Sequence, residues 1–263
     1  YTNRLNSFMN QMIVLDNTNK GYSLALTAAV QKSFSQHWEG GLAYTYTLAQ
    51  EAAIGSSDQS GSGWATNNIS INPNVPELGA SNFAVPHRIV AHGSYRLEYR
   101  NKTMATTFGI FYSAQPQERY TFRYGADING DDQTNDMLYI PRDPSEIQFV
   151  EGFITRAGTF TAKQQSDAFF AFIENDKYLR KHKEQMMEKY GALLPWQHTL
   201  DLRVMQDFVF RTGTKKHTIQ VSVDVLNLLN LLNSNWGYRY QYTFGTFQDA
   251  GIVGKPTPKT SSA

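Results

Sequence analysis

Two stretches near the end of the chain decide its fold: Leu200-Asp-Leu-Arg-Val-Met-Gln-Asp-Phe-Val-Phe210 and Ile219-Gln-Val-Ser-Val-Asp-Val225. Both alternate apolar and polar side chains over most of their length. Successive side chains of a β-strand point to opposite faces, so this period of two predicts strands with one apolar face. The pattern recurs upstream, and we expect eight strands, near residues 6–15, 21–35, 40–51, 86–100, 103–115, 197–211, 216–229 and 236–247.

The expected strands are long, and their connections alternate in length. Ordinary strands average about 5–6 residues, whereas a tilted membrane-crossing strand needs about 9–11. Short turns are expected at Ser35–Gly40, Arg100–Lys102 and Arg211–Lys215, and long loops at 52–85 and 116–196. Short links at Asp16–Lys20 and Asn230–Asn235 fall on the long-loop side and weaken the pattern. Short turns at one end and long loops at the other are typical of an antiparallel transmembrane β-barrel.

A soluble β-sandwich also alternates, with its apolar face turned inward. Two features favour the barrel over the sandwich. Loops beyond about 15 residues are uncommon in compact domains, and the loop 116–196 far exceeds that length. Aromatic residues gather near the strand ends, as the interfacial girdles of a membrane barrel require; they are Trp38, Tyr44, Tyr46, Tyr99, Tyr112, Phe208 and Phe210.

Composition excludes several classes of protein. The chain has 24 Lys and Arg against 23 Asp and Glu, a balance that argues against a nucleic-acid partner. It has no Cys, so disulfides, thiolate metal sites and Cys nucleophiles are absent. No apolar run approaches the roughly 18 residues of a membrane-crossing helix. The chain opens without Met or a signal peptide, and we expect it to be a piece of a longer polypeptide.

No constellation predicts catalysis. None of the six His residues forms the HExxH pattern of a metalloprotease, and G-x-S-x-G and glycine-rich phosphate loops are absent. We expect the His residues to have structural roles or to lie on the surface. We also expect that the chain is not an enzyme. Within the longer loop, apolar residues at helical spacing predict a helix over 166–190 that Ser166 would cap.

One acidic segment of this loop resembles a calcium loop. Asp127, Asn129 and Asp131 stand at alternate positions, as hard oxygen ligands do, and Asp136 follows. An EF-hand is excluded, because position 6 is Asp132 instead of Gly and the Glu of position 12 is missing. A looser calcium site and a simple run of Asx turns remain as alternatives.

The polar face of the expected strands, opposite the apolar face, also carries charged residues. In a barrel this face looks into the lumen, where charges contact a plug or line a channel; in a soluble fold they are plain solvent-exposed residues. The residues are Arg96, Glu98, Asp201, Arg203, Asp207 and Asp224.

Several motifs together resemble TonB-dependent outer-membrane receptors. Pro195 precedes an Asp-bearing strand, and the next strand ends in the D-x-x-N-x-x-N pattern of Asp224, Asn227 and Asn230. Further similar segments are Val85-Pro-His-Arg-Ile89, Asp127–Asp136 followed by Leu138-Tyr-Ile-Pro141, Asp176-Lys-Tyr-Leu179 and Asn233-Ser-Asn-Trp-Gly237. They resemble the branch with a carboxypeptidase-regulatory-like or Cna-type N-terminal domain, typical of Bacteroidota.

The resemblance implies a 22-stranded barrel that encloses an N-terminal plug, in the outer membrane of a Gram-negative bacterium. Residues 1–247 would be its C-terminal segment of about eight strands, and 248–263 an irregular tail. The implied partners are the remaining strands and plug of the same polypeptide, TonB through that plug, the lipid bilayer and a surface lipoprotein. The implied activity is import of a large or scarce solute, such as a siderophore, glycan or peptide.

Two alternatives remain open at this stage. The chain could instead be a self-closed eight-stranded barrel that serves as an adhesin or as a scaffold of an envelope complex. Small residues on the polar face of strands 21–35 and 40–51 argue against it, because they leave space that a plug would fill. A soluble glycan-binding sandwich or an enzyme ranks last.

Overall fold

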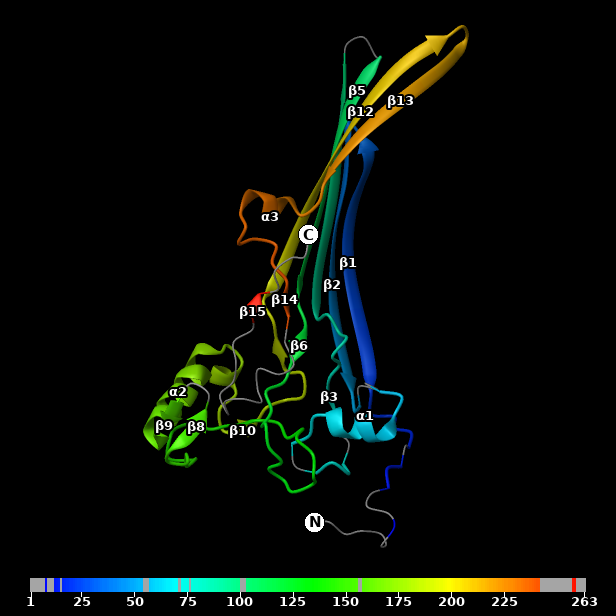
Figure 1. The fold of residues 1–263 in the computed structure, drawn as a ribbon. Helices are drawn as coiled ribbons and strands as arrows, with labels where there is room; N and C mark the ends of the chain where they lie inside the picture. Colours follow the sequence, from blue (N-terminus) through cyan, green and yellow to red (C-terminus); the bar gives the residue numbers. More distant parts are fainter. Residues whose placement is uncertain are drawn as a thin grey trace.

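The computed structural model describes residues 8, 12–14, 16–53, 57–70, 72–75, 77–99, 103–155, 158–241 and 257–258. Most of the expected strand 6–15 lies outside these residues, as does nearly all of the expected tail 248–263. Figure 1 shows a long twisted sheet with the two long connections gathered at one of its ends. Among the described helices, none is both long and apolar enough to cross a membrane.

The sheet is antiparallel and follows the order β1-β2-β4-β5-β12-β13. The predicted strands 21–35, 40–51, 86–100, 103–115 and 197–211 are confirmed within a few residues at each end, and the strand predicted at 216–229 stops at Val225. The long strands are β1 Tyr22–Ser35, β2 Trp38–Glu51, β4 His87–Glu98, β5 Met104–Pro116, β12 Trp196–Thr212 and β13 Lys215–Val225. The two-residue strand β3 (Gly79–Ala80) pairs with the end of β2.

The register gives the sheet two chemically different faces. On one face Leu202 lies between Ile110 of β5 and Val225 of β13. On the other face its neighbour Arg203 lies between Gly109 and Asp224. Every pair in the sheet is antiparallel, and each keeps one register apart from an irregularity between Lys32 and Ser35 at the end of β1, so this parity holds from β1 to β13. We call the two sides the apolar face and the polar face.

Two turns at the end of the sheet away from the long connections are tight. β1 and β2 are joined by two residues, Gln36 and His37, with φ of 51° and 71°. Positive φ at both central positions is the primed turn whose twist matches that of the flanking strands. The predicted turn Ser35–Gly40 is therefore shorter than expected. β12 and β13 are joined through Gly213, whose φ of 62° suits a residue without a side chain.

The sheet is open within the described residues. β1 pairs with β2 alone, and β13 with β12 alone, so each end of the strand order presents an unpaired edge. The expected strand 236–247 is described only at β14 (Tyr240–Gln241), which pairs with β15 (Thr257–Pro258). Closure into a barrel and the number of strands therefore stay predictions.

The long connections contain short elements that the sequence pattern did not predict. α1 covers Ser60–Thr66, and the helix α3 (Leu228–Leu232) occupies the link expected at 230–235. The strands β7 and β10 pair with each other, as do β6 with β11 and β8 with β9. Their bounds are β6 Arg119–Tyr120, β7 Tyr139–Ile140, β8 Phe153–Thr155, β9 Gly158–Phe160, β10 Gln185–Met186 and β11 Ala192–Leu193.

The prediction of a helix at 166–190 is correct for its first part and wrong for the remainder. α2 spans Ala162–Asn175 and begins at Thr161, which forms a capping box with Gln164. It ends because Asp176 Oδ1 accepts the backbone N–H groups of Tyr178 and Leu179 at 2.8 and 2.9 Å. These bonds start the separate 3-10 turn η1 (Leu179–Lys181), which is followed by β10.

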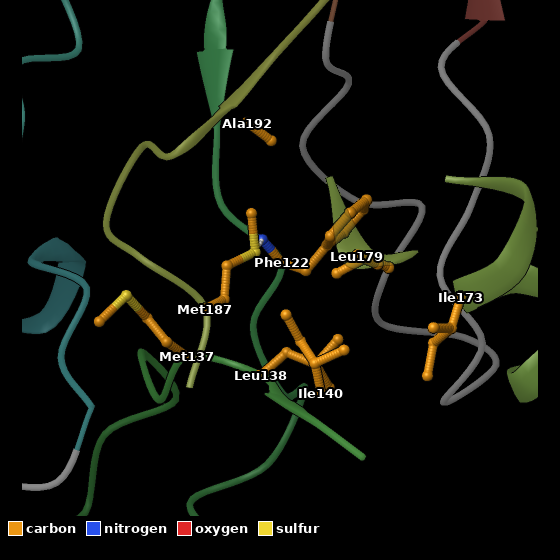
Figure 2. Close-up of a cluster of buried hydrophobic side chains, with 8 residues drawn as sticks. All are labelled: Phe122, Met137, Leu138, Ile140, Ile173, Leu179, Met187 and Ala192. Carbon is orange, nitrogen blue, oxygen red and sulfur yellow. Dashed lines mark hydrogen bonds between the residues drawn. The ribbon is translucent and has the colours of Figure 1, made fainter. Parts of the chain in front are cut away.

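The described parts of 52–85 and 116–196 fold together at the end of the sheet opposite the β12–β13 turn, and we call this unit the loop cap (Figure 1). Its small core joins residues of β7, α2, η1 and β11 and of the segments beside them (Figure 2). Phe122 lies edge-on to Phe172 of α2, with ring centroids 5.3 Å apart. The buried members of the core are Phe122, Met137, Leu138, Ile140, Ile173, Leu179, Met187 and Ala192.

Candidate functional site

The polar face carries a charge cluster near the β12–β13 turn. Arg96 Nη1 donates to Asp207 Oδ2 at 2.7 Å and to Thr107 Oγ1 at 3.3 Å, and Arg96 Nε lies 3.6 Å from Glu98 Oε1. Asp207 is 6% exposed, and its Oδ1 accepts a bond from Gln220 Nε2 at 2.7 Å. Three of the predicted site residues thus meet across β4 and β12.

The other three predicted charges lie nearer the middle of the same face. Arg203 and Asp224 are register partners and form a two-pronged pair, Nε–Oδ1 at 2.5 Å and Nη2–Oδ2 at 2.9 Å. Asp201 Oδ1 accepts the N–H of Asn227 at 2.8 Å, where the chain leaves β13. All six charges share the polar face, as their parity predicted. Whether this face lines a lumen stays a prediction.

The polar face is hollowed at its loop-cap end, where a cavity of about 610 Å³ opens. Small side chains of β1 and β2 form its floor, among them Ser23, Thr45 and Ala49. Arg88 and Glu51 contribute one charge of each sign. The small residues that the sequence placed on this face therefore leave room beside the sheet.

The apolar face ends in aromatic rings. At the loop-cap end Tyr44 Oη lies 2.8 Å from His87 Nδ1, and Tyr112 Oη lies 2.8 Å from His198 Nδ1. Trp196 stacks between the two imidazoles, with centroids 6.0 and 6.2 Å away. At the opposite end, exposed aromatic rings include Trp38, Tyr95, Phe208 and Phe210. The sequence predicted aromatic strand ends, but these cross-strand pairs depend on a register that it does not reveal.

Between these ends, the apolar face is exposed. Val30 is 77% exposed, Ile110 51% and Val223 59%. Contiguous apolar surface beyond a few hundred Å² marks a place where something other than water contacts the protein. This exposed apolar face is therefore a candidate contact surface.

Lys189 joins the two long connections of the loop cap, and the sequence pattern did not predict this role. Its ammonium group is buried and donates to the backbone oxygen of Ala52 at 2.7 Å and to Asn67 Oδ1 at 2.5 Å. Burial lowers the pKa of Lys189, although the nearby carboxylates of Glu51 and Glu77 oppose this. The bonds join the two long connections. Nothing in the local pattern distinguishes this Lys from the solvated ones around it.

The acidic segment 127–136 forms a curled loop at the surface of the loop cap. Asp127 accepts the N–H groups of Gly130, Asp131 and Asp132 at 2.7, 3.2 and 2.9 Å, and these bonds lower its pKa despite some loss of hydration. Asn129 Oδ1 accepts from Asp131 N at 3.0 Å. In the described part of the chain, no three His, Asp or Glu groups converge as metal ligands do. Calcium stays a prediction.

Comparison of the chain with protein-family models, with curated proteins and with solved structures found no match.

Proposed function

We propose that the chain is the C-terminal segment of the transmembrane β-barrel of a TonB-dependent outer-membrane receptor, which imports a large or scarce solute. The observation that carries this proposal is the exposed apolar face, which extends across six long antiparallel strands. In lipid, such a face contacts acyl chains, and every backbone polar group is satisfied inside a closed ladder.

The height of the apolar band supports the proposal. His198 and Phe208 mark its two ends on β12 and are ten residues apart. At about 3.3 Å per residue the band is about 33 Å long, and a strand tilt of about 40° reduces its height to about 25 Å. This is the height of the apolar band of outer-membrane barrels.

The unequal ends of the sheet also support the proposal. The loop cap lies at one end, and the tight turn through Gly213 lies at the other (Figure 1). Outer-membrane barrels have long loops on the outside and short turns on the periplasmic side. The loop cap would then form part of the external mouth of the receptor.

The polar face would line the lumen, with its six charges turned toward the plug. The cavity beside Thr45 and Ala49 leaves room for a plug or a solute. The unpaired edges of β1 and β13 would pair with the other strands of the same polypeptide, because an open edge in lipid leaves backbone groups unsatisfied. TonB would contact the plug, and a surface lipoprotein would contact the external mouth.

The mass of the native polypeptide tests this proposal against the small self-closed barrel. Antibodies against the loop cap would recover the protein from isolated outer membranes, and intact mass spectrometry would follow. We expect a mass several times the 29.8 kDa of this chain, with plug peptides upstream of Tyr1. A mature species near 29.8 kDa would instead support the adhesin or scaffold, and recovery in buffer without detergent would contradict both.

A further inference from the structure

Asp136 has a buried carboxylate, and within the described residues only one of its two oxygens has a hydrogen-bond partner. It is 2% exposed, and its Oδ2 accepts the N–H of Ile128 at 2.8 Å. Its Oδ1 is buried and has no hydrogen-bond partner in the described structure. Burying an ionised carboxylate is costly unless it is paired or coordinates a metal ion. The bond from Ile128 joins the other oxygen, Oδ2, to the start of the acidic loop.

The segment that ends at Asp136 is rich in carboxylates. Asp127, Asp131 and Asp132 lie within the same ten residues. Among the described residues, the ion pairs of Lys and Arg all involve other carboxylates. A buried carboxylate oxygen without a hydrogen-bond partner, in a segment with three further carboxylates, favours a bound cation.

The backbone of the loop has the turn that a calcium loop needs. In an EF-hand, Gly at position 6 provides the sharp bend. Asp132 holds this position and adopts a φ of 67°, a left-handed conformation that Asp tolerates better than most residues. The missing Gly is therefore no obstacle to the bend. The available ligands are carboxylate, amide and backbone oxygens, which suit Ca²⁺.

We propose that residues 127–136 form a calcium site in which Asp136 supplies the buried carboxylate and Asp127, Asn129 and Asp131 supply the remaining side-chain oxygens. Each carboxylate has about four lone-pair sites, so Asp127 can keep its backbone bonds and also bind the ion. Binding would draw the loop onto Asp136, because the three carboxylates do not converge in the structure described here.

The site would also fasten the two long connections to each other. Asp136 forms a parallel bridge with Ile69, and the N–H of Met137 donates to the backbone oxygen of Ile69 at 2.8 Å. Asn135 Nδ2 donates to the backbone oxygens of Trp64 and Asn67 at 3.2 and 2.7 Å. An ion on Asp136 would therefore stabilise the segment that holds both halves of the loop cap.

Isothermal titration calorimetry with calcium chloride tests the site in detergent-solubilised protein after removal of metals by chelation. We expect saturable binding with a Kd of about 10⁻⁴ M or tighter. Asp136→Asn should weaken binding at least about tenfold, since it removes a charged ligand. The matched control is Asp143→Asn, an exposed Asp of the same connection that caps a turn at Ser145, and it should bind as the wild type does.

A second variant and a second readout keep the test decisive if Asp136→Asn does not fold. Asp131→Asn removes a more exposed ligand and should also weaken binding, and calcium should slow tryptic cleavage of the wild-type loop cap. The proposal is overturned if the wild type shows no binding at millimolar calcium, or if both ligand variants bind as the wild type does. Because binding is measured directly, this result is independent of the mass of the native polypeptide.

Discussion

The sheet and the loop cap place their apolar side chains in opposite ways. In the loop cap, Ile173, Leu179 and Ile140 are fully buried around a small core (Figure 2). In the sheet, Leu26 and Val223 are more than half exposed on a face that no described element covers. The difference indicates that the cap encloses a core of its own, whereas the sheet presents apolar surface to its surroundings.

The largest effect should come from the core of the loop cap. Ile173→Ala removes a fully buried side chain and should lower the free energy of unfolding of the cap by about 2–5 kcal/mol. Ile219→Ala is its counterpart in the sheet, where the side chain is 55% exposed and its removal leaves no cavity. Pulse proteolysis in urea at constant detergent concentration measures both variants. Equal losses would contradict the distinction between the two regions.

A charge on the apolar face should have the next largest effect. In lipid vesicles, Val223→Arg should cost about 2–4 kcal/mol of folding free energy, because a lipid-facing sheet would hold the guanidinium group at mid-bilayer depth. Ser222→Arg puts the same group on the polar face, one residue away, and should cost much less. Urea titration of tryptophan fluorescence in vesicles measures the difference. Similar costs at both positions would argue against a lipid-facing side.

The charge cluster of the polar face should matter less, but measurably. Arg96→Met leaves the carboxylate of Asp207 without its guanidinium partner and should cost about 1–3 kcal/mol. The control is Arg142→Met, which breaks the exposed pair with Glu184 on the cap and should cost about 0–1 kcal/mol. The same vesicle titration applies. If Arg96→Met lowers the folding free energy no more than the control does, the charge cluster does not stabilise the sheet.

The smallest effect should be a pH dependence confined to the loop cap. Burial raises the pKa of Tyr178 to about 12, whereas an unfolded chain ionises Tyr near about 10. The unfolded state therefore loses its proton first, so this contribution to stability is complete below about pH 10 and is lost as the pH rises toward 12. In Tyr178→Phe the decline of cap stability over this range should be shallower, as followed by proteolysis. An unchanged slope would show that Tyr178 does not contribute to it.

The sheet was predictable because its signal is local. Alternation along each strand fixes the face of every side chain, so the parity of Arg96, Asp207 and Asp224 followed from the sequence. Their pairings did not follow, because the contact between Arg96 and Asp207 depends on the register of three strands. The length of β13 was overestimated, since Leu226 continues the apolar run although the chain turns at Asn227, which has a φ of 52°.

The loop cap was largely unpredictable because its strands have only two or three residues and pair over long separations. β6 meets β11 and β7 meets β10 without any period that a sequence reveals. The second half of the predicted helix failed for a specific reason: the side chain of Asp176 hydrogen-bonds the backbone and ends α2. Lys189 and the buried oxygen of Asp136 depend on this packing and could not be predicted from spacing.

Accessibility of spin labels to oxygen tests the central claim most directly. The chain has no native Cys, so single nitroxides can be attached at Val223 and Leu26 on the apolar face and at Ser222 and Thr27 on the polar face. In vesicles, we predict high accessibility to O₂ and low accessibility to a water-soluble nickel chelate at Val223 and Leu26, with the reverse ratio at their neighbours. Labels at Val223 and Leu26 that the nickel chelate reaches freely, or that neither reagent reaches, would contradict a lipid-facing sheet.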